Sequence, residues 1–146
     1  KYVSEMKLGP AYDKTTDMGP VVNEGHLKFV SNWIQTGIEE GAVPVVDGRK
    51  PQVPAGCEKG FFIGPTVLDH VTEDMSVGRE EIFGPVLCVK RVNNFEEGIT
   101  LMNNSRFANG SVIYTQNGYY AREFAFRTHG GMVGSLFCWP IATVIL

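Results

Sequence analysis

Residues 80–92 read EEIFGPVLCVKRV: two carboxylates, an aromatic residue and a Gly-Pro turn, followed by a nearly continuous apolar run. An apolar run of this kind is typical of a strand buried on both faces, and we predict such a strand over residues 85–92. The two glutamates stand just before it, where a charged group needs either solvent or a partner. The stretch therefore predicts a buried strand that begins at a polar turn.

Helix and strand signals alternate on both sides of this stretch. Apolar residues at spacings of three and four predict an amphipathic helix over residues 24–40, with Asn23 as its N-cap and Gly41 at its end. Asn94 and Glu97 form a capping-box-like start for a second helix. The other predicted elements are strands at 42–46, 110–115 and from 131, an extended segment at 61–68, and helices at 95–104 and 119–129, the last ending at Gly130. This alternation predicts an α/β fold with a largely parallel sheet and flanking helices.

The composition excludes several classes of protein. With 146 residues, 43% of them hydrophobic, the chain reads as one globular domain. Its net charge of −3 and the lack of a basic block argue against nucleic acid or an anionic membrane as a partner. The apolar end, residues 133–146, contains Pro140 and is shorter than the ~20 residues that span a bilayer. We expect it to be a core element without its covering layers, with a membrane anchor as the alternative.

The chemistry of a carboxylate gives the pair Glu80 and Glu81 two interpretations. The first is a solvated turn. The second is a ribose site, because a carboxylate only accepts hydrogen bonds and one carboxylate can accept from both hydroxyls of a diol. Phe83 could then lie against a flat heterocycle, and Gly84-Pro85 would fix the turn that aims both side chains.

The motifs around this stretch resemble the C-terminal part of the catalytic domain of the aldehyde dehydrogenase superfamily. The resemblance covers about residues 5–134. It rests on EEIFGPV together with DMGPVVN at 17–23, EEGA at 39–42, GFFIGPTV at 60–67, FANGSVIYT at 107–115 and GMVG at 131–134. Within the superfamily, the chain looks most like the CoA-acylating methylmalonate-semialdehyde dehydrogenase branch. The resemblance implies a partial catalytic domain over residues 1–134 and a divergent apolar tail over 135–146.

The resemblance also implies a cofactor and two binding residues. Glu81 matches the family glutamate that contacts the nicotinamide ribose of NAD, and Phe83 matches the aromatic residue beside the nicotinamide ring. Glu80 has no matching role. The complete enzyme would use NAD to oxidise a small semialdehyde to an acyl-CoA with loss of carbon dioxide, and it would be a homo-oligomer.

No catalytic residue is predicted within these 146 residues. The family's nucleophilic cysteine lies upstream of the matched region in a glycine-rich context, which Cys57, Cys88 and Cys138 all lack. Their odd number and the absence of a CxxC spacing indicate free thiols in a cytoplasmic protein. We therefore expect the isolated chain to be inactive. The alternatives are a part of another NAD(P)-dependent aldehyde dehydrogenase, or a non-catalytic module that pairs with related subunits.

The histidines and the clustered aromatic residues are predicted to be structural or solvated. His26, His70 and His129 have no metal-ligand spacing, so no metal site is predicted; His26 and His129 are placed in the first and last turns of helices. Helical spacing predicts core packing for the aromatic residues of the third helix, with a stacking surface as the alternative. These are Tyr119, Tyr120, Phe124 and Phe126.

Overall fold

The computed structural model describes residues 2–107, 109–136 and 143–145 of the chain. They divide into two compact units, Lys1–Arg91 and Val92–Leu146, called here the first and the second unit. The first unit contains η1 (Val3–Glu5), α1 (Glu24–Glu39), β1 (Val43–Val46), β2 (Thr66–Asp69), η2 (Ser76–Gly78) and β3 (Val86–Cys88). The second contains α2 (Phe95–Asn103), β4 (Gly110–Tyr114), α3 (Gly118–Arg127), β5 (Met132–Leu136) and β6 (Thr143–Ile145).

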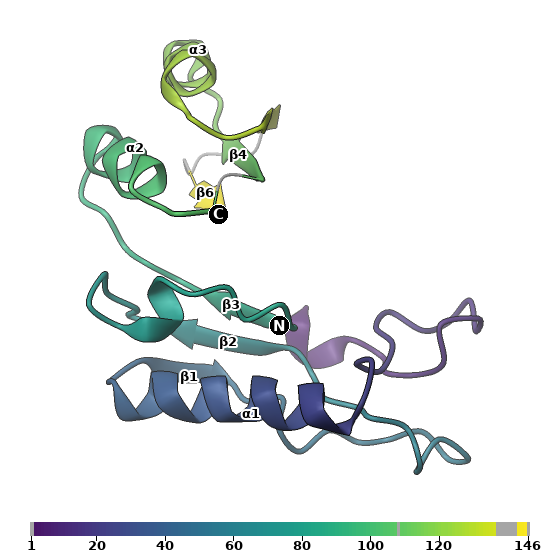
Figure 1. The fold of residues 1–146 in the computed structure, drawn as a ribbon. Coiled ribbons are helices and arrows are strands. Elements are labelled where there is room, and N and C mark those ends of the chain that lie inside the picture. Colours follow the sequence, from purple (N-terminus) through teal and green to yellow (C-terminus); the bar gives the residue numbers. More distant parts are fainter. Residues whose placement is uncertain (1, 108, 137–142, 146) are drawn as a thin grey trace. The chain divides into compact units, whose positions relative to one another are not determined.

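Helix α1 matches its prediction to within one residue. The Asn23 side chain accepts a hydrogen bond from the backbone N–H of His26 at 2.8 Å and so caps the helix. Val30 and Ile34 are fully buried, as the apolar spacing predicts. In Figure 1 the helix lies alongside the three-stranded sheet of the first unit. It forms one core with that sheet and the segments around it, whose fully or nearly buried members are Val30, Ile34, Ala42, Ile63, Leu68, Val71, Val77 and Ile82.

The first sheet has the order β1-β2-β3, with an antiparallel β1–β2 pair and a parallel β2–β3 pair. The prediction of a strand buried on both faces over residues 85–92 is wrong. Strand β3 covers only three residues, and Leu87 at its centre is 44% exposed. The physical reason is alternation: Val86 and Cys88 face the α1 core, so Leu87 faces the other side of the sheet. No described element of the first unit buries Leu87.

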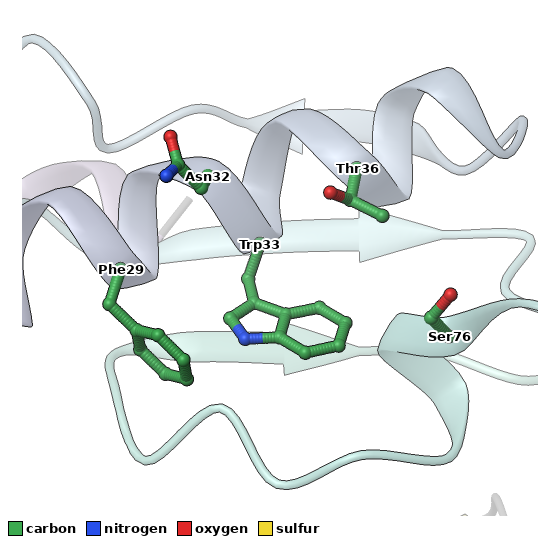
Figure 2. A pocket seen from close by; sticks show the side chains of 5 residues that line it. All are labelled: Phe29, Asn32, Trp33, Thr36 and Ser76. Atoms are coloured by element: carbon green, nitrogen blue, oxygen red, sulfur yellow. The ribbon is translucent and has the colours of Figure 1, made fainter.

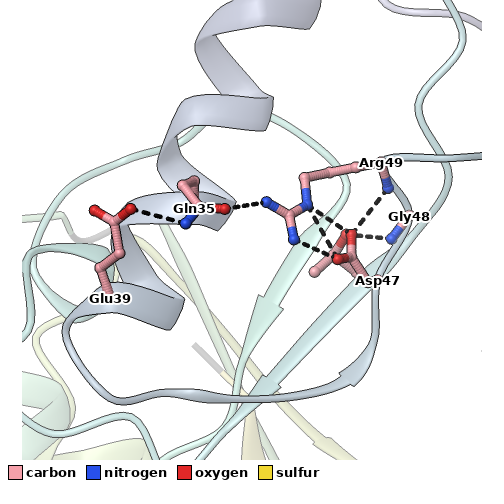
Figure 3. Close-up of polar contacts among 6 residues, drawn as sticks. Gln35, Glu39, Asp47, Gly48 and Arg49 are labelled. Carbon is pink, nitrogen blue, oxygen red and sulfur yellow. Dashed lines mark hydrogen bonds and ion pairs between the residues drawn. The ribbon is translucent and has the colours of Figure 1, made fainter.

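A chain of polar contacts fastens α1 to the turn that follows β1 (Figure 3). Arg49 donates through Nη1 to Gln35 Oε1 at 2.5 Å and through Nε to Asp47 Oδ1 at 2.9 Å. Gln35 Nε2 in turn donates to Glu39 at 2.8 Å. The guanidinium of Arg49 holds the pKa of the Asp47 carboxyl below its usual value, because it donates to the charged form.

The second unit has a sheet of order β5-β4-β6, with a parallel β4–β5 pair and an antiparallel β4–β6 pair. The α/β class is confirmed. The described residues do not make a single, largely parallel sheet, however, because each unit has its own sheet with one pairing of each kind. The core of the second unit consists of Ile99, Met102, Ile113 and Phe124.

The predicted N-cap of α2 is confirmed, with one difference. Asn94 Oδ1 accepts from the Glu97 backbone N–H at 2.9 Å. The Glu97 carboxylate accepts from the backbone N–H of Asn93 at 2.8 Å, one residue before the position that a capping box uses.

Helix α3 ends earlier than predicted. Thr128 is already extended, with φ −78° and ψ 140°, so Gly130 does not terminate the helix and His129 does not lie in its last turn. The cause is a side chain distant in sequence. Asn103 donates through Nδ2 to Arg127 O at 2.7 Å and accepts through Oδ1 from the His129 N–H at 3.0 Å. The amide thus satisfies the backbone where the helix stops.

The apolar end enters two strands. Residues 132–136 form β5, and 143–145 form β6, which pairs with β4. The predictions for residues 137–142, including Cys138 and Pro140, lie outside the described residues. In the described part of the chain, no helix is long and apolar enough to cross a membrane. The predicted boundary after residue 134 is a different division from the two compact units and stays a prediction.

Candidate functional site

The polar turn of the opening stretch is anchored at both ends. At its start, the backbone N–H of Glu80 donates to Ser76 O at 2.9 Å, which continues η2. At its end, Pro85 O accepts from the Thr66 N–H at 2.8 Å, and the Val86 N–H donates to Gly84 O at 2.7 Å. The segment between these points has a fixed course on the first unit.

Glu40, the C-cap of α1, contacts η2, the short helix that leads into the turn. Its carboxylate accepts from the Ser76 hydroxyl and from the Ser76 backbone N–H, the latter at 2.7 Å. The Ser76 hydroxyl is the main reason that the pKa of Glu40 lies below its usual value. A charged group at the end of α1 therefore holds η2 and, through it, the start of the turn.

Burial separates the residues of the turn into two groups. Ile82 is buried in the core of the first unit, whereas its neighbours Glu81 and Phe83 are exposed. Phe83 keeps 80% of its surface exposed. Within the described part of the chain, the Glu81 carboxylate has no hydrogen-bond or ion-pair partner. The turn thus presents an unpaired carboxylate and an open aromatic ring two residues apart.

Phe83 has a backbone conformation that non-glycine residues rarely adopt. Its φ is +52°, in the left-handed region, which is unfavourable for a bulky side chain. Its carbonyl oxygen accepts a hydrogen bond from His26 Nε2 of α1 at 2.8 Å. The next residue, Gly84, lies against α1 so closely that a Cβ would be 2.7 Å from Val30 Cγ2. Such strain persists where surrounding contacts hold it, and it is found often at ligand-binding sites.

Sequence reasoning missed the part of His26 in this site. The histidine was expected to be structural or solvated, and the structure places its ring against the turn that carries Glu81 and Phe83. His26 and Phe83 are 57 positions apart. No local pattern in the sequence could indicate this contact.

This arrangement is suited to binding and not to bond-making. A free carboxylate can accept from two hydroxyl groups of a diol, and an exposed ring beside it can contact a planar group. Neither residue is a nucleophile paired with a base. Phe83 has no titratable group, and Glu81 has no neighbour within hydrogen-bond distance among the described residues.

The sequence profile of the aldehyde dehydrogenase family matches residues 1–135. The chain belongs to the aldehyde dehydrogenase family. Malonate-semialdehyde dehydrogenase 1 of Oceanobacillus iheyensis is 43% identical over 134 residues, which are 92% of this chain and 27% of the relative. The chain therefore spans about a quarter of the length of the curated relatives that it matches.

Solved structures of aldehyde dehydrogenases have the same fold. The methylmalonate-semialdehyde dehydrogenase DddC of Oceanimonas doudoroffii is 42% identical and superposes with a TM-score of 0.87, covering 92% of this chain and 27% of its own. A Sinorhizobium meliloti protein described as a methylmalonate-semialdehyde dehydrogenase, solved with NAD, is 44% identical with a TM-score of 0.86; the match covers 95% of this chain and 28% of that one. The recognised family and its α/β fold are thereby confirmed.

The two described cysteines, Cys57 and Cys88, are both free and partly buried. Cys88 Sγ donates to Val77 O at 3.4 Å, and burial raises the pKa of its thiol, which keeps the thiol protonated and unreactive. Cys57 is a free, half-buried cysteine in a loop turn, where its carbonyl accepts from the Gly60 N–H. Among the described residues, no group of histidine, cysteine or acidic side chains could hold a metal ion.

The first unit also has a hollow between α1 and η2, shown in Figure 2. Its volume is about 160 Å³, well below the ~300–1,000 Å³ of ordinary ligand pockets. It contains no titratable side chain; the lining residues are Phe29, Asn32, Trp33, Thr36 and Ser76. A wider hollow, of about 460 Å³, is lined by Asp47, Arg49 and Lys50, where Arg49 already donates to Asp47. The turn at Glu81 and Phe83 is the candidate site because it presents a carboxylate that has no partner among the described residues.

Proposed function

We propose that Glu81 and Phe83 form the nicotinamide side of the NAD site in an NAD-dependent, CoA-acylating malonate- or methylmalonate-semialdehyde dehydrogenase. The observation that carries the proposal is the pair itself: a carboxylate with no partner among the described residues and an 80% exposed aromatic ring, on a turn held in a strained conformation. The names of the similar proteins supply the substrate class, and the complex of one of them with NAD supplies the cofactor.

The residues present fit the nicotinamide ribose. No described residue occupies the Glu81 carboxylate, so both of its oxygens can accept from the two ribose hydroxyls through charge-assisted hydrogen bonds. The Phe83 ring is open to solvent and can lie beside the nicotinamide ring. When bound, NAD supplies the hydride acceptor for aldehyde oxidation. Glu81 and Phe83 would orient it without taking part in proton or hydride transfer.

The reaction of the whole protein follows from the same proposal. A small semialdehyde would be oxidised at a cysteine nucleophile and released to CoA as an acyl thioester, with loss of the substrate carboxylate as carbon dioxide. The nucleophile lies outside the positions that these 146 residues match in the family. We place the complete enzyme in the cytoplasm as a homo-oligomer. We also propose that residues 1–134 are its catalytic-domain segment and that 135–146 are a divergent tail.

The test of the cofactor role is Glu81→Gln in a full-length chimaera, in which residues 1–134 replace the aligned segment of the Oceanobacillus iheyensis enzyme. The substitution removes the charge but keeps the shape. We expect the binding free energy for NAD to weaken by about 1.5–3 kcal/mol, so that its Kd rises roughly 10- to 150-fold, as charged hydrogen bonds are lost. Titration of protein fluorescence with NAD measures it.

The control for this experiment is Glu80→Gln, which makes the same chemical change at the neighbouring position. We expect the NAD affinity of this variant to equal that of the parent chimaera. An unchanged Kd in Glu81→Gln, or equal losses in both variants, would remove the assigned role of Glu81.

A separate expectation concerns the 146-residue chain by itself. Supplied with malonate semialdehyde, CoA and NAD, it should form no NADH above the uncatalysed rate, because burial raises the pKa of the Cys88 thiol and the family nucleophile lies outside the matched positions. Absorbance at the NADH band gives the rate, and the parent chimaera serves as positive control. Turnover by the chain alone would contradict this part of the proposal.

A further inference from the structure

We infer that His26 is a positioning residue, which holds the Phe83 carbonyl and thereby aims Glu81 and Phe83 at the cofactor. The inference deepens the proposed function and rests on it, because it assigns a residue to the same site. His26 itself contacts the backbone of the turn and lies on α1, a different element from the one that carries the binding side chains.

Three contacts fix His26, one through its backbone and two through its ring. Its backbone N–H is bound by the Asn23 cap at 2.8 Å, which sets its place in the first turn of α1. Its ring stacks on Phe29, with a centroid distance of 5.7 Å and an interplanar angle of 18°, and Phe29 in turn meets the edge of Trp33 at 6.2 Å. Nε2 then reaches Phe83 O at 2.8 Å. Contacts within the α1 region therefore fix both the backbone and the ring plane of His26, independently of its hydrogen bond to the turn.

The direction of this hydrogen bond fixes the protonation of one ring nitrogen. A carbonyl oxygen can only accept, so Nε2 must carry a proton, in the neutral Nε2–H tautomer or in the imidazolium. The second ring nitrogen is not needed for the contact. An amide side chain that carries N–H groups can make the same hydrogen bond, and an apolar side chain cannot.

The turn needs this restraint because Phe83 stands at φ +52° without being a glycine. Two contacts with α1 act on it. The packing of Gly84 on Val30 sets how near the turn lies to the helix, since a Cβ there would come within 2.7 Å of Val30 Cγ2. The hydrogen bond from His26 sets the direction of the Phe83 carbonyl. The peptide plane that joins Phe83 to Gly84 is therefore held by the histidine.

The test uses the full-length chimaera with His26→Leu, His26→Gln and, as a control on the same helix, Lys28→Leu. Lys28 is exposed and forms an ion pair with Glu24 on the same helix. Two quantities are measured: hydrogen exchange of the peptide 80–86 without NAD, and the Kd for NAD. We expect His26→Leu to speed exchange in this peptide and to weaken NAD binding about 2- to 10-fold, the equivalent of one hydrogen bond. His26→Gln should restore much of both, and Lys28→Leu should change neither.

A merely structural role would give a different pattern. It would lower the melting temperature and alter the KM for the semialdehyde along with the Kd for NAD, and His26→Gln would not rescue it. That pattern, or unchanged exchange and affinity in His26→Leu, overturns the inference. Failure of the proposed function is separate: Glu81→Gln would then leave NAD affinity unchanged, while faster exchange of 80–86 in His26→Leu would still support the positioning of the turn.

Discussion

Replacing Gly48 by alanine is expected to destabilise the first unit by at least about 3 kcal/mol, the upper end of ordinary overpacking costs. The turn after β1 crosses the segment before β2 at this point. Gly64 N–H donates to Gly48 O at 2.8 Å, and Gly48 N–H donates to Thr66 Oγ1 at 3.0 Å. A Cβ on Gly48 would lie 1.9 Å from Gly64 O. Since backbone atoms meet here, no side-chain rotation can relieve the clash.

Urea unfolding followed by circular dichroism, with hydrogen exchange of the β1 and β2 peptides, measures this effect. The matched control is Gly19→Ala in the same unit, where the nearest atoms to the new Cβ would be 3.9 Å away. We expect its free energy of unfolding to stay within about 0.5 kcal/mol of the parent value, as for substitutions outside packed sites. Equal stability of Gly48→Ala and Gly19→Ala would show that the two segments can separate without cost.

The parts of this fold that the sequence predicts best are those with local causes. Asn23 and Asn94 cap α1 and α2, because an N-cap side chain and the backbone N–H that donates to it are only three residues apart. The apolar spacing of α1 likewise points to Val30 and Ile34, which are fully buried. These signals lie within one turn or two of the helix and need no knowledge of the rest of the chain.

The errors come from contacts between distant residues. Asn103 ends α3 from 24 positions away, so the sequence around Gly130 gives the wrong terminus. Leu87 is apolar like its neighbours, and only the pairing and packing of β3 decide that its face is open. The prediction of a largely parallel sheet failed for the same reason. The pairs β1–β2 and β4–β6 are antiparallel, and no local pattern specifies the geometry of the connections between these strands.

The candidate site shows the same division. The chemistry of a carboxylate left a solvated turn and a ribose site both open, and the resemblance to the aldehyde dehydrogenase family pointed to Glu81 and Phe83. Their exposure agrees with a binding role, which stays a proposal. The positive φ of Phe83 was not predictable, since only glycine signals that conformation in a sequence. The role of His26 was missed because its partner is a backbone carbonyl, and every residue type has one, so the sequence does not show which carbonyl the histidine contacts.

Removal of the Phe124 side chain is expected to have the largest effect on the second unit. Phe124 is fully buried, and no other described residue of α3 is buried. It packs with Ile99, Met102 and Ile113, so one aromatic ring supplies much of a small core. Phe124→Ala should therefore cost about 3–5 kcal/mol, the usual range for a buried phenylalanine. A loss of this size is a large part of the total stability of a small domain.

Phe126→Ala is the matched control, because Phe126 lies two positions further on the same helix and is 84% exposed. We expect its free energy of unfolding to change by no more than about 0.5 kcal/mol. The comparison also decides between the two interpretations of the aromatic cluster: core packing applies to Phe124, whereas Phe126 is left on the surface. Hydrogen exchange of the α2 and β4 peptides should quicken in Phe124→Ala alone. Equal exchange in both variants would mean that the ring of Phe124 does not hold α3 on the sheet.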